Sequence, residues 1–179
     1  MGSSFWSDPA LEPKRMFRWI MLMGGVPQWI VKQVSKPSFQ IGEAQHQYIN
    51  HTFKYPGRVT WQDVNVTLVD PVDPDAAKTM VNIVRNAGYS FPSDPNDVTT
   101  MSKANAVASL GKVTIQQLGP EAGEIVEQWS LVNAWVKDVN FGDLNYESDE
   151  LTNIEIVLSY DFARMELPGD DAAIRPANE

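Results

Sequence analysis

The sequence predicts a mainly β fold, an antiparallel β-sandwich or barrel with one packed α-helix. Residues 60–69 alternate apolar and polar side chains, and residues 152–162 do so over a longer run. Residues 74–87 form the one long stretch with apolar side chains at helical spacing. A period of two residues is typical of half-buried strands. Several such strands and one amphipathic helix indicate sheets that bury one face against a helix or a second sheet.

The composition is that of an ordinary globular domain with an excess of acid. The 179 residues include 43% hydrophobic and 21% charged residues, no cysteine, and a formal net charge of −9. The lack of cysteine excludes a disulfide framework, a thiolate metal site and a cysteine nucleophile. The acidic balance does not suit a protein that grips DNA, because such proteins present basic patches. The longest apolar run, residues 16–31, is interrupted by Arg18 and Pro27, so we expect no membrane span and no membrane partner.

The N-terminal part predicts an arm followed by a hairpin. Residues 1–14 are an irregular arm, and Phe5 and Trp6 within it indicate a segment that docks on its own domain or on a neighbour. Gly24 and Gly25 predict a tight turn, because glycine tolerates the positive φ of hairpin turns. The expected hairpin spans residues 16–36, with strands at 16–23 and 29–34.

Residues 39–55 are polar and aromatic, and they predict a long, exposed, two-stranded excursion that ends at Pro56 and Gly57. The strand 60–69 follows. Its alternation places Val64, Val66 and Leu68 on one face and Asp63, Asn65 and Thr67 on the other.

The helix at 74–87 carries start and stop signals. Asp73 suits the N-cap, Pro74 the first helical position and Gly88 the C-cap. We expect the helix to lie on a sheet through an apolar face made of Ala77, Met80, Val81, Val84 and Ala87. Residues 88–101 are rich in turn residues and predict a loop, and residues 102–109 predict a short helix.

The C-terminal part predicts four strands, at 112–118, 125–132, 135–141 and 152–162. In the last of them one face is expected to consist of Ile154, Ile156, Leu158, Tyr160 and Phe162. Residues 167–179 predict a tail that is mobile or depends on a partner for its order. The inventory of about seven or eight strands and one good helix agrees with the predicted fold class.

The stretch "FGDLNYESDE", residues 141–150, crowds oxygen ligands in a way that raises the question of a calcium site. An EF-hand loop that began at Asp143 would place Ser148 and Ile154 at positions 6 and 12, where Gly and Glu are required. We therefore interpret the stretch as an acidic turn in which Asp149 pins the backbone locally. A looser calcium site and a carboxylate-pair hydrolase remain alternatives.

The sequence does not match the other catalytic and metal-binding motifs that we tested against it. His46 and His51 are the only histidines, and their spacing of five does not match the i, i+4 pair of a helical metal site. "GYSFP" has Pro92 where a nucleophile elbow requires Gly, and "GK" is followed by Val113 rather than Ser or Thr. The sequence thus predicts no enzyme and no cofactor, and it favours a structural or binding protein.

The aromatic residues leave two classes of binding protein open. Six Trp, five Tyr and seven Phe could stack on sugars, as in a monomeric carbohydrate-binding β-sandwich. Aromatic side chains more often fill cores and interfaces, however. Trp61, Trp129 and Trp135 lie in predicted strands, so we expect them in a core or an interface.

Two long stretches resemble tail tube proteins of contractile-tailed bacteriophages. One is "EQWSLVNAWVKDVNFGDLNYESDELTNIEIVLSYDFA", residues 127–163, and the other spans residues 17–74. The marks that recur together are a "WSL" segment, a "V-x-F/Y-G-D-L-x-Y" turn, "S-D-E-L", and a long alternating strand that closes on "Y-D-F". The resemblance covers well over half of the chain, and its specificity lies in the order of the marks, since none of them is catalytic.

The resemblance implies a fold and an assembly. Tube proteins of this family, whose fold the type VI secretion tube proteins share, form rings of six subunits that stack into a hollow tube. Each subunit gives strands to a β-barrel around the lumen, and a helix lies outside. The implied division is an arm at 1–14, a tail tube β domain at 15–166 with an inter-ring excursion at 43–58 and a helix at 74–87, and a tail at 167–179.

The resemblance also assigns candidate contact residues. Those expected between stacked rings are Glu43, His46, Tyr48, His51, Phe53 and Tyr55. Those expected at a contact between subunits or at a structural corner are Trp135, Phe141, Asp143, Leu144, Tyr146 and Asp149. Those expected to line the lumen or to lie on a polar face are Asp63, Asn65, Thr67, Glu155 and Ser159.

The implied role is a structural conduit for genome delivery. Its partners would be further copies of itself, the tail sheath, baseplate and terminator proteins, a tape-measure protein, and double-stranded DNA in transit. The place would be the virion tail, assembled in the host cytoplasm. A tube of a phage-like injection or secretion system is the alternative within this architecture. Six copies would carry a charge of about −54, and we hypothesise that an acidic lumen repels the phosphates of passing DNA.

Overall fold

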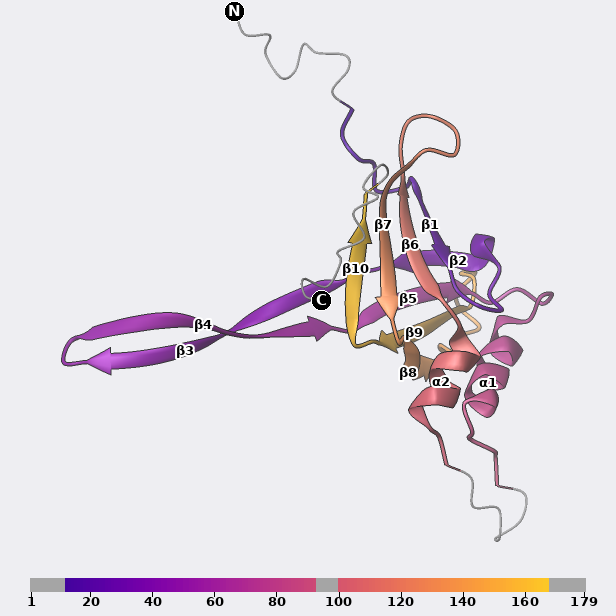
Figure 1. Cartoon of the computed structure of the whole chain (residues 1–179). Coiled ribbons are helices and arrows are strands. Elements are labelled where there is room, and N and C mark those ends of the chain that lie inside the picture. Colours follow the sequence, from indigo (N-terminus) through magenta and orange to yellow (C-terminus); the bar gives the residue numbers. More distant parts are fainter. Residues whose placement is uncertain (1–11, 93–99, 168–179) are drawn as a thin grey trace, which may run out of the picture.

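The computed structural model describes residues 12–92 and 100–167 as a β-sandwich, with a long hairpin that projects from it and two helices at one end (Figure 1). One sheet has the order β1-β6-β7-β10 and the other β2-β5-β9-β8, and every pairing is antiparallel. The first sheet consists of β1 Trp19–Leu22, β6 Val113–Leu118, β7 Ile125–Val132 and β10 Phe162–Glu166. The second consists of β2 Val31–Val34, β5 Val64–Val69, β9 Asn153–Ser159 and β8 Trp135–Asn140. The predicted mainly β fold class is confirmed.

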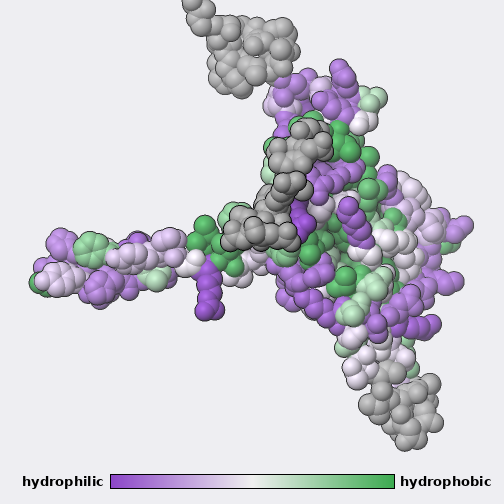
Figure 2. All heavy atoms as spheres, in the orientation of Figure 1, coloured by the Kyte–Doolittle hydropathy of each residue, from purple (hydrophilic) through white to green (hydrophobic). Residues whose placement is uncertain are grey.

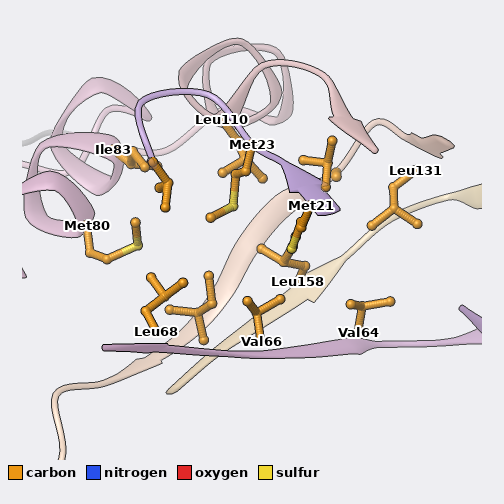
Figure 3. Close-up of a cluster of buried hydrophobic side chains, with 14 of the residues drawn as sticks. Met21, Met23, Val64, Val66, Leu68, Met80, Ile83, Leu110, Leu131 and Leu158 are labelled. Carbon is orange, nitrogen blue, oxygen red and sulfur yellow. The ribbon is translucent and has the colours of Figure 1, made fainter. Parts of the chain in front are cut away.

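The core lies between the two sheets and under the helices. Val64, Val66 and Leu68 of β5 are buried, as their alternation predicts, and they face side chains of the opposite sheet such as Met21 and Leu131. Figure 3 shows these side chains converging with Met80 and Leu110 of the helices and with Leu158 of β9. One continuous apolar cluster therefore joins both sheets to the helical end.

The predicted hairpin at 16–36 is wrong, although its turn is present. Met23 and Val26 form an antiparallel bridge across the two glycines, and Gly25 has a φ of 75°. After the turn, the 3-10 helix η2, Gln28–Ile30, buries Ile30 and redirects the chain. As a result β1 pairs with β6 in one sheet, whereas β2 pairs with β5 in the other.

The structure has two helices, where the sequence predicts one clear helix and one short candidate. Helix α1, Ala76–Asn86, starts two residues later than expected, and its N-cap is Asp75, not Asp73. The carboxylate of Asp70 also accepts from the backbone N–H groups of Ala76 and Ala77, at 3.2 and 3.3 Å. Helix α2, Lys103–Leu110, is capped by Ser102 and confirms the short helix.

The apolar face of α1 also differs from the prediction. Met80 is in the core, but Ile83, absent from the predicted face, is buried as well, and Val81 and Val84 are only half-buried. The helix lies beside α2 at one end of the sandwich (Figure 1), and the face that meets the core runs through Ala76, Met80 and Ile83.

The predicted strand 152–162 is two strands. β9 ends at Ser159, and β10 starts at Phe162 in the opposite sheet. The carboxylate of Asp161 holds this corner by accepting from Lys103 Nζ at 2.7 Å and Asn133 Nδ2 at 2.7 Å, and these bonds lower its pKa. The alternation breaks at the corner, so Ile154, Ile156 and Leu158 are buried as expected but Phe162 is exposed.

A buried carboxylate ties the N-terminal arm and the start of the hairpin to β7. The side chain of Glu127 is 8% exposed and pairs with Lys14 and with Lys36 Nζ at 2.8 Å. It also accepts from Trp129 Nε1 at 2.5 Å. Burial raises the pKa of Glu127, but the hydrogen bonds from the two lysines and the indole outweigh burial and lower it to about 2. We call Glu127, Lys14, Lys36 and Trp129 the Glu127 clasp.

Core packing gives the first prediction. Leu158→Ala removes a fully buried side chain and leaves a cavity, so the free energy of unfolding should fall by about 2–5 kcal/mol. Val157→Ala, on the outer and half-buried side of the same strand, is the matched control and should cost about 1 kcal/mol or less. Urea denaturation of the monomer measures both variants, and equal losses would contradict the assigned register of β9.

The Glu127 clasp gives the second prediction. Because the folded pKa lies below the ordinary value of 4.5, the clasp stabilises the fold above about pH 4.5, and this contribution is lost as the pH falls towards about 2. Glu127→Gln should lower the free energy of unfolding by about 2–3 kcal/mol at pH 7. The gap between wild type and variant should narrow at pH 3 and below. Urea titrations across this range test it, and a gap independent of pH would contradict it.

Candidate assembly site

The most exposed element is the hairpin of β3, Ser38–Tyr48, and β4, His51–Gln62, which projects far from the sandwich (Figure 1). Every residue of the two strands is exposed except Trp61, which is half-buried. The strands meet in a two-residue turn, where Ile49 is 82% exposed with a φ of 53°. A positive φ is unusual for a β-branched residue. The expected exposed excursion at 43–58 is present as the outer part of this longer hairpin.

The hairpin carries two apolar faces. Cross-strand partners share a face, so the pairs Ala44–Tyr55, His46–Phe53 and Tyr48–His51 form what we call the distal aromatic face. The pairs Phe39–Trp61 and Ile41–Val59 form the proximal apolar face. Because side chains alternate along β3, the two apolar faces lie on opposite sides of the hairpin.

The change of face coincides with a bulge. The register shifts between Ile41 and Glu43, where Gly42 lies opposite two residues of β4. At Gly57 an added Cβ would lie 3.0 Å from the carbonyl of Gly42, so glycine permits the close approach of the strands. A bulge increases local twist, and the hairpin is strongly twisted at its middle (Figure 1).

The predicted inter-ring candidates divide between the two sides of the outer hairpin. His46, Tyr48, His51, Phe53 and Tyr55 all lie on the distal aromatic face. Glu43 lies on the other side, where it pairs with Lys54 at 3.3 Å and accepts from Gln45. The sequence reasoning missed the proximal apolar face, although Phe39, Ile41 and Val59 are each about half exposed.

Aromatic packing fixes the root of the hairpin to the sandwich. Trp61 packs on the core, with Phe39 at 5.2 Å on one side and Tyr160 at 6.0 Å on the other, measured between ring centroids. The Tyr160 hydroxyl donates to the carbonyl oxygen of Gln62 at 2.7 Å. Burial raises the pKa of Tyr160, which keeps the hydroxyl protonated as a donor. Figure 2 shows hydrophobic side chains gathered where the hairpin leaves the body.

The acidic stretch lies in the loop 141–152, between β8 and β9, which we call the acidic loop. Its local hydrogen bonds are made by Asn140, Asn145 and Ser148, whose side chains accept from backbone N–H groups. Among the described residues Asp149 makes no such bond, so its predicted pinning role is wrong. Leu144 and Tyr146 are almost fully exposed. Within residues 12–92 and 100–167 no three His, Asp or Glu side chains are placed to hold a metal ion.

The remaining predicted corner and lumen residues lie on the sandwich or its loop. Trp135 is half-buried and pairs with Ser159, while Phe141, Asp143 and Leu144 are exposed in the acidic loop. The predicted lumen residues share the outer face of the second sheet, in register pairs such as Thr67–Glu155. They are Asp63, Asn65, Thr67, Glu155 and Ser159.

A cavity of about 370 Å³ opens beside the root of the hairpin, and we call it the arm cleft. Its lining includes Lys14, Arg15, Met16, Trp19, Val34 and Lys36. The carbonyl oxygens of Arg15 and Arg18 accept from Gln117 Nε2 at 2.7 and 2.8 Å, which fixes the segment 15–18, just before β1, along one wall. No helix in the described parts of the chain is long and apolar enough to span a membrane.

The fold recurs in solved chains from contractile injection systems. A chain from the cryo-EM structure of the PVC extracellular contractile injection system sheath/tube terminator in the extended state aligns with a TM-score of 0.64 and 16% identity, over 88% of this chain and 99% of that chain. A chain from the anti-feeding prophage cap, the AFP tube terminating cap, aligns with a TM-score of 0.62 and 15% identity, over 90% and 97%.

A third chain, from the PVC sheath-tube complex in the extended state, aligns with a TM-score of 0.59 and 16% identity, over 93% of this chain and 99% of that chain. No family model and no curated protein sequence matches this chain. The tail tube-like fold that the sequence resemblance implied is therefore confirmed by structure, at identities too low to carry more than the fold.

Proposed function

We propose that the chain is a structural subunit that assembles with copies of itself into a hollow tube of the contractile-tail type. The observation that carries this proposal is the β3–β4 hairpin, which exposes apolar side chains on both sides. A two-stranded hairpin is marginally stable on its own in water. Exposed apolar faces of this kind mark protein interfaces. We therefore expect the apolar faces of the hairpin to be buried in an interface. In the proposed tube, stacked copies of the same chain would bury them.

Ring closure would use the open edges of the sandwich. The strands at the edges are β1 and β10 in one sheet and β2 and β8 in the other. Edge strands of a free subunit expose unpaired backbone N–H and C=O groups, which can pair with other chains. Joining the sheets of neighbouring subunits into a closed barrel pairs these groups. We propose rings of six, as in the family that the sequence resembles, with the outer face of the second sheet towards the lumen.

The lumen-facing charge is smaller than the whole-chain charge implies. On the proposed lumen face, the acids Asp63, Asp138 and Glu155 oppose Lys32 and Lys137, which leaves a net charge of −1 per subunit. Repulsion of DNA phosphates from this face would therefore be weak per subunit and would add up only along the tube. This favours a smooth, weakly acidic lumen over a strongly charged one.

Two settings fit the proposed tube. In a phage tail, the subunit would line the path of double-stranded DNA, with sheath, baseplate, terminator and tape-measure proteins as partners. In a phage-like injection system, the tube would carry another cargo. Two of the solved chains of similar fold come from a contractile injection system and one from the tube terminating cap of the anti-feeding prophage, which supports the second setting as much as the first. In both settings the role is structural and the place is a tail-like particle.

Assembly by the distal aromatic face gives the third prediction. Purified protein should form rings or tubes in negative-stain electron microscopy at high concentration. Phe53→Glu places a charge in the centre of this face and should raise the concentration needed for assembly at least about tenfold. The free energy of unfolding should change little, because Phe53 is exposed in the free subunit.

Thr52→Glu is the matched control. Thr52 pairs with Gln47 on the polar side of the same part of the hairpin, so the same charge should be tolerated there. Equal effects of the two substitutions would refute the assignment of the contact face. A protein that stays monomeric at every concentration and binds a defined sugar would instead support the carbohydrate-binding alternative.

A further inference from the structure

We propose that the acidic loop of one copy docks in the arm cleft of a second copy, and so forms a head-to-tail contact that repeats along an assembly. This inference rests on the proposed self-assembly and specifies one of its contacts. It joins two surface regions of the described residues that are complementary in charge and in apolar character.

The arm cleft is a cationic pocket with apolar walls. Its apolar lining includes Met16, Trp19 and Val34, and Met16 is 95% exposed. The cations that line the cleft are Lys14, Arg15 and Lys36, and the acids paired with them are Glu12 and Glu127. Three cations against two carboxylates leave a net charge of +1. In a chain with a net charge of −9, this region is a local exception that would attract an acidic segment.

The acidic loop has the matching chemistry. It carries Asp143, Glu147, Asp149 and Glu150 and no Lys or Arg, which gives a charge of −4. It also exposes large apolar side chains, of which Leu144 and Tyr146 are almost fully exposed and Leu151 is 70% exposed. Neither its acids nor its apolar side chains find a use within the described part of the subunit, since the local bonds of the loop come from Asn145 and Ser148. A segment of this kind fits a cationic, partly apolar pocket.

The two regions lie at opposite ends of the second sheet, so one chain cannot bring them together. The acidic loop joins the end of the sheet where Val69 pairs with Asn153. The arm cleft includes Val34 and Lys36, at the end where the chain passes from β2 into the hairpin. The intervening strand β5 has 6 residues, which corresponds to about 20 Å.

This placement sets the kind of contact. Two different patches at opposite ends of one subunit make a heterologous interface, which propagates from copy to copy rather than closing as a dimer. The hairpin leaves the subunit from the cleft end, so the loop of the next copy would arrive beside the root of the hairpin. The same end of the subunit would then present both the hairpin and the cleft to its neighbour.

Engineered cysteines test the contact, because the chain has no cysteine of its own. Met16→Cys and Leu144→Cys are prepared separately, mixed at a concentration that supports assembly, and oxidised. We expect a disulfide-linked heterodimer on a non-reducing gel. The matched control mixes Met16→Cys with Phe91→Cys, which places an exposed thiol in the loop after α1 and should give little cross-linked product.

Charge reversal supplies an independent readout. Arg15 lies outside the Glu127 clasp, so Arg15→Glu should weaken assembly about tenfold without loss of folding, and Asp149→Lys should do the same. The two changes in one chain should restore most of the lost affinity, because each contact then pairs opposite charges again. Sedimentation velocity measures the three variants. Simple addition of the two losses would overturn the contact.

The outcomes separate this contact from the tube itself. Tubes that form without the cross-link would overturn the contact and leave the proposed function standing, with the cleft taken by another segment or partner. The cross-link without rings or tubes would support the contact and overturn the proposed tube. Both together would support the two inferences.

Discussion

The structure depends on one constraint, which is that a 25-residue hairpin leaves the sandwich without burying its own apolar side chains. In a free subunit this costs stability, because neither side of the hairpin is shielded from water. The features around its root compensate by holding its direction. Trp61 and Tyr160 attach β4 to the core, and the Glu127 clasp attaches the chain before β3 to β7. The contacts at the root thus set the direction of the hairpin within the single subunit.

The connections between the two sheets of the sandwich help to hold the β3–β4 hairpin in place. The chain passes repeatedly between the two sheets, and each crossing described has a specific local lock. Asp161 binds Lys103 and Asn133 where β9 leads into β10, and η2 buries Ile30 where β1 leads to β2. The Asp161 bonds join the β9–β10 connection to α2 and to the residue after β7, and η2 anchors the β1–β2 connection in the core. Because β2 and β5 continue almost directly into the hairpin, a rigid second sheet sets its position.

Much of the fold could be predicted from periodicity, but strand partners could not. Alternation located Val64, Val66 and Leu68 correctly, since one face of β5 is buried and one is solvated. It could not show that the turn at Gly25 sends the chain into the other sheet, because both continuations have the same local pattern. The Glu127 clasp was missed, yet a signal exists. Glu127 shares a face with Trp129 and Leu131, and a carboxylate at an inward position of a strand requires cationic or hydrogen-bonding partners.

The distribution of charge explains how an acidic chain can associate with itself. With a net charge of −9, copies repel one another at long range, and this keeps free subunits apart. Much of the excess acid is local, since the acidic loop alone holds four carboxylates while the proposed lumen face is nearly balanced. The arm cleft is the opposite local exception. General repulsion combined with one complementary pair of patches disfavours random contacts and leaves a preferred relative orientation. In the proposed assembly, the acidity of the chain would therefore contribute more to the order of assembly than to the passage of a cargo.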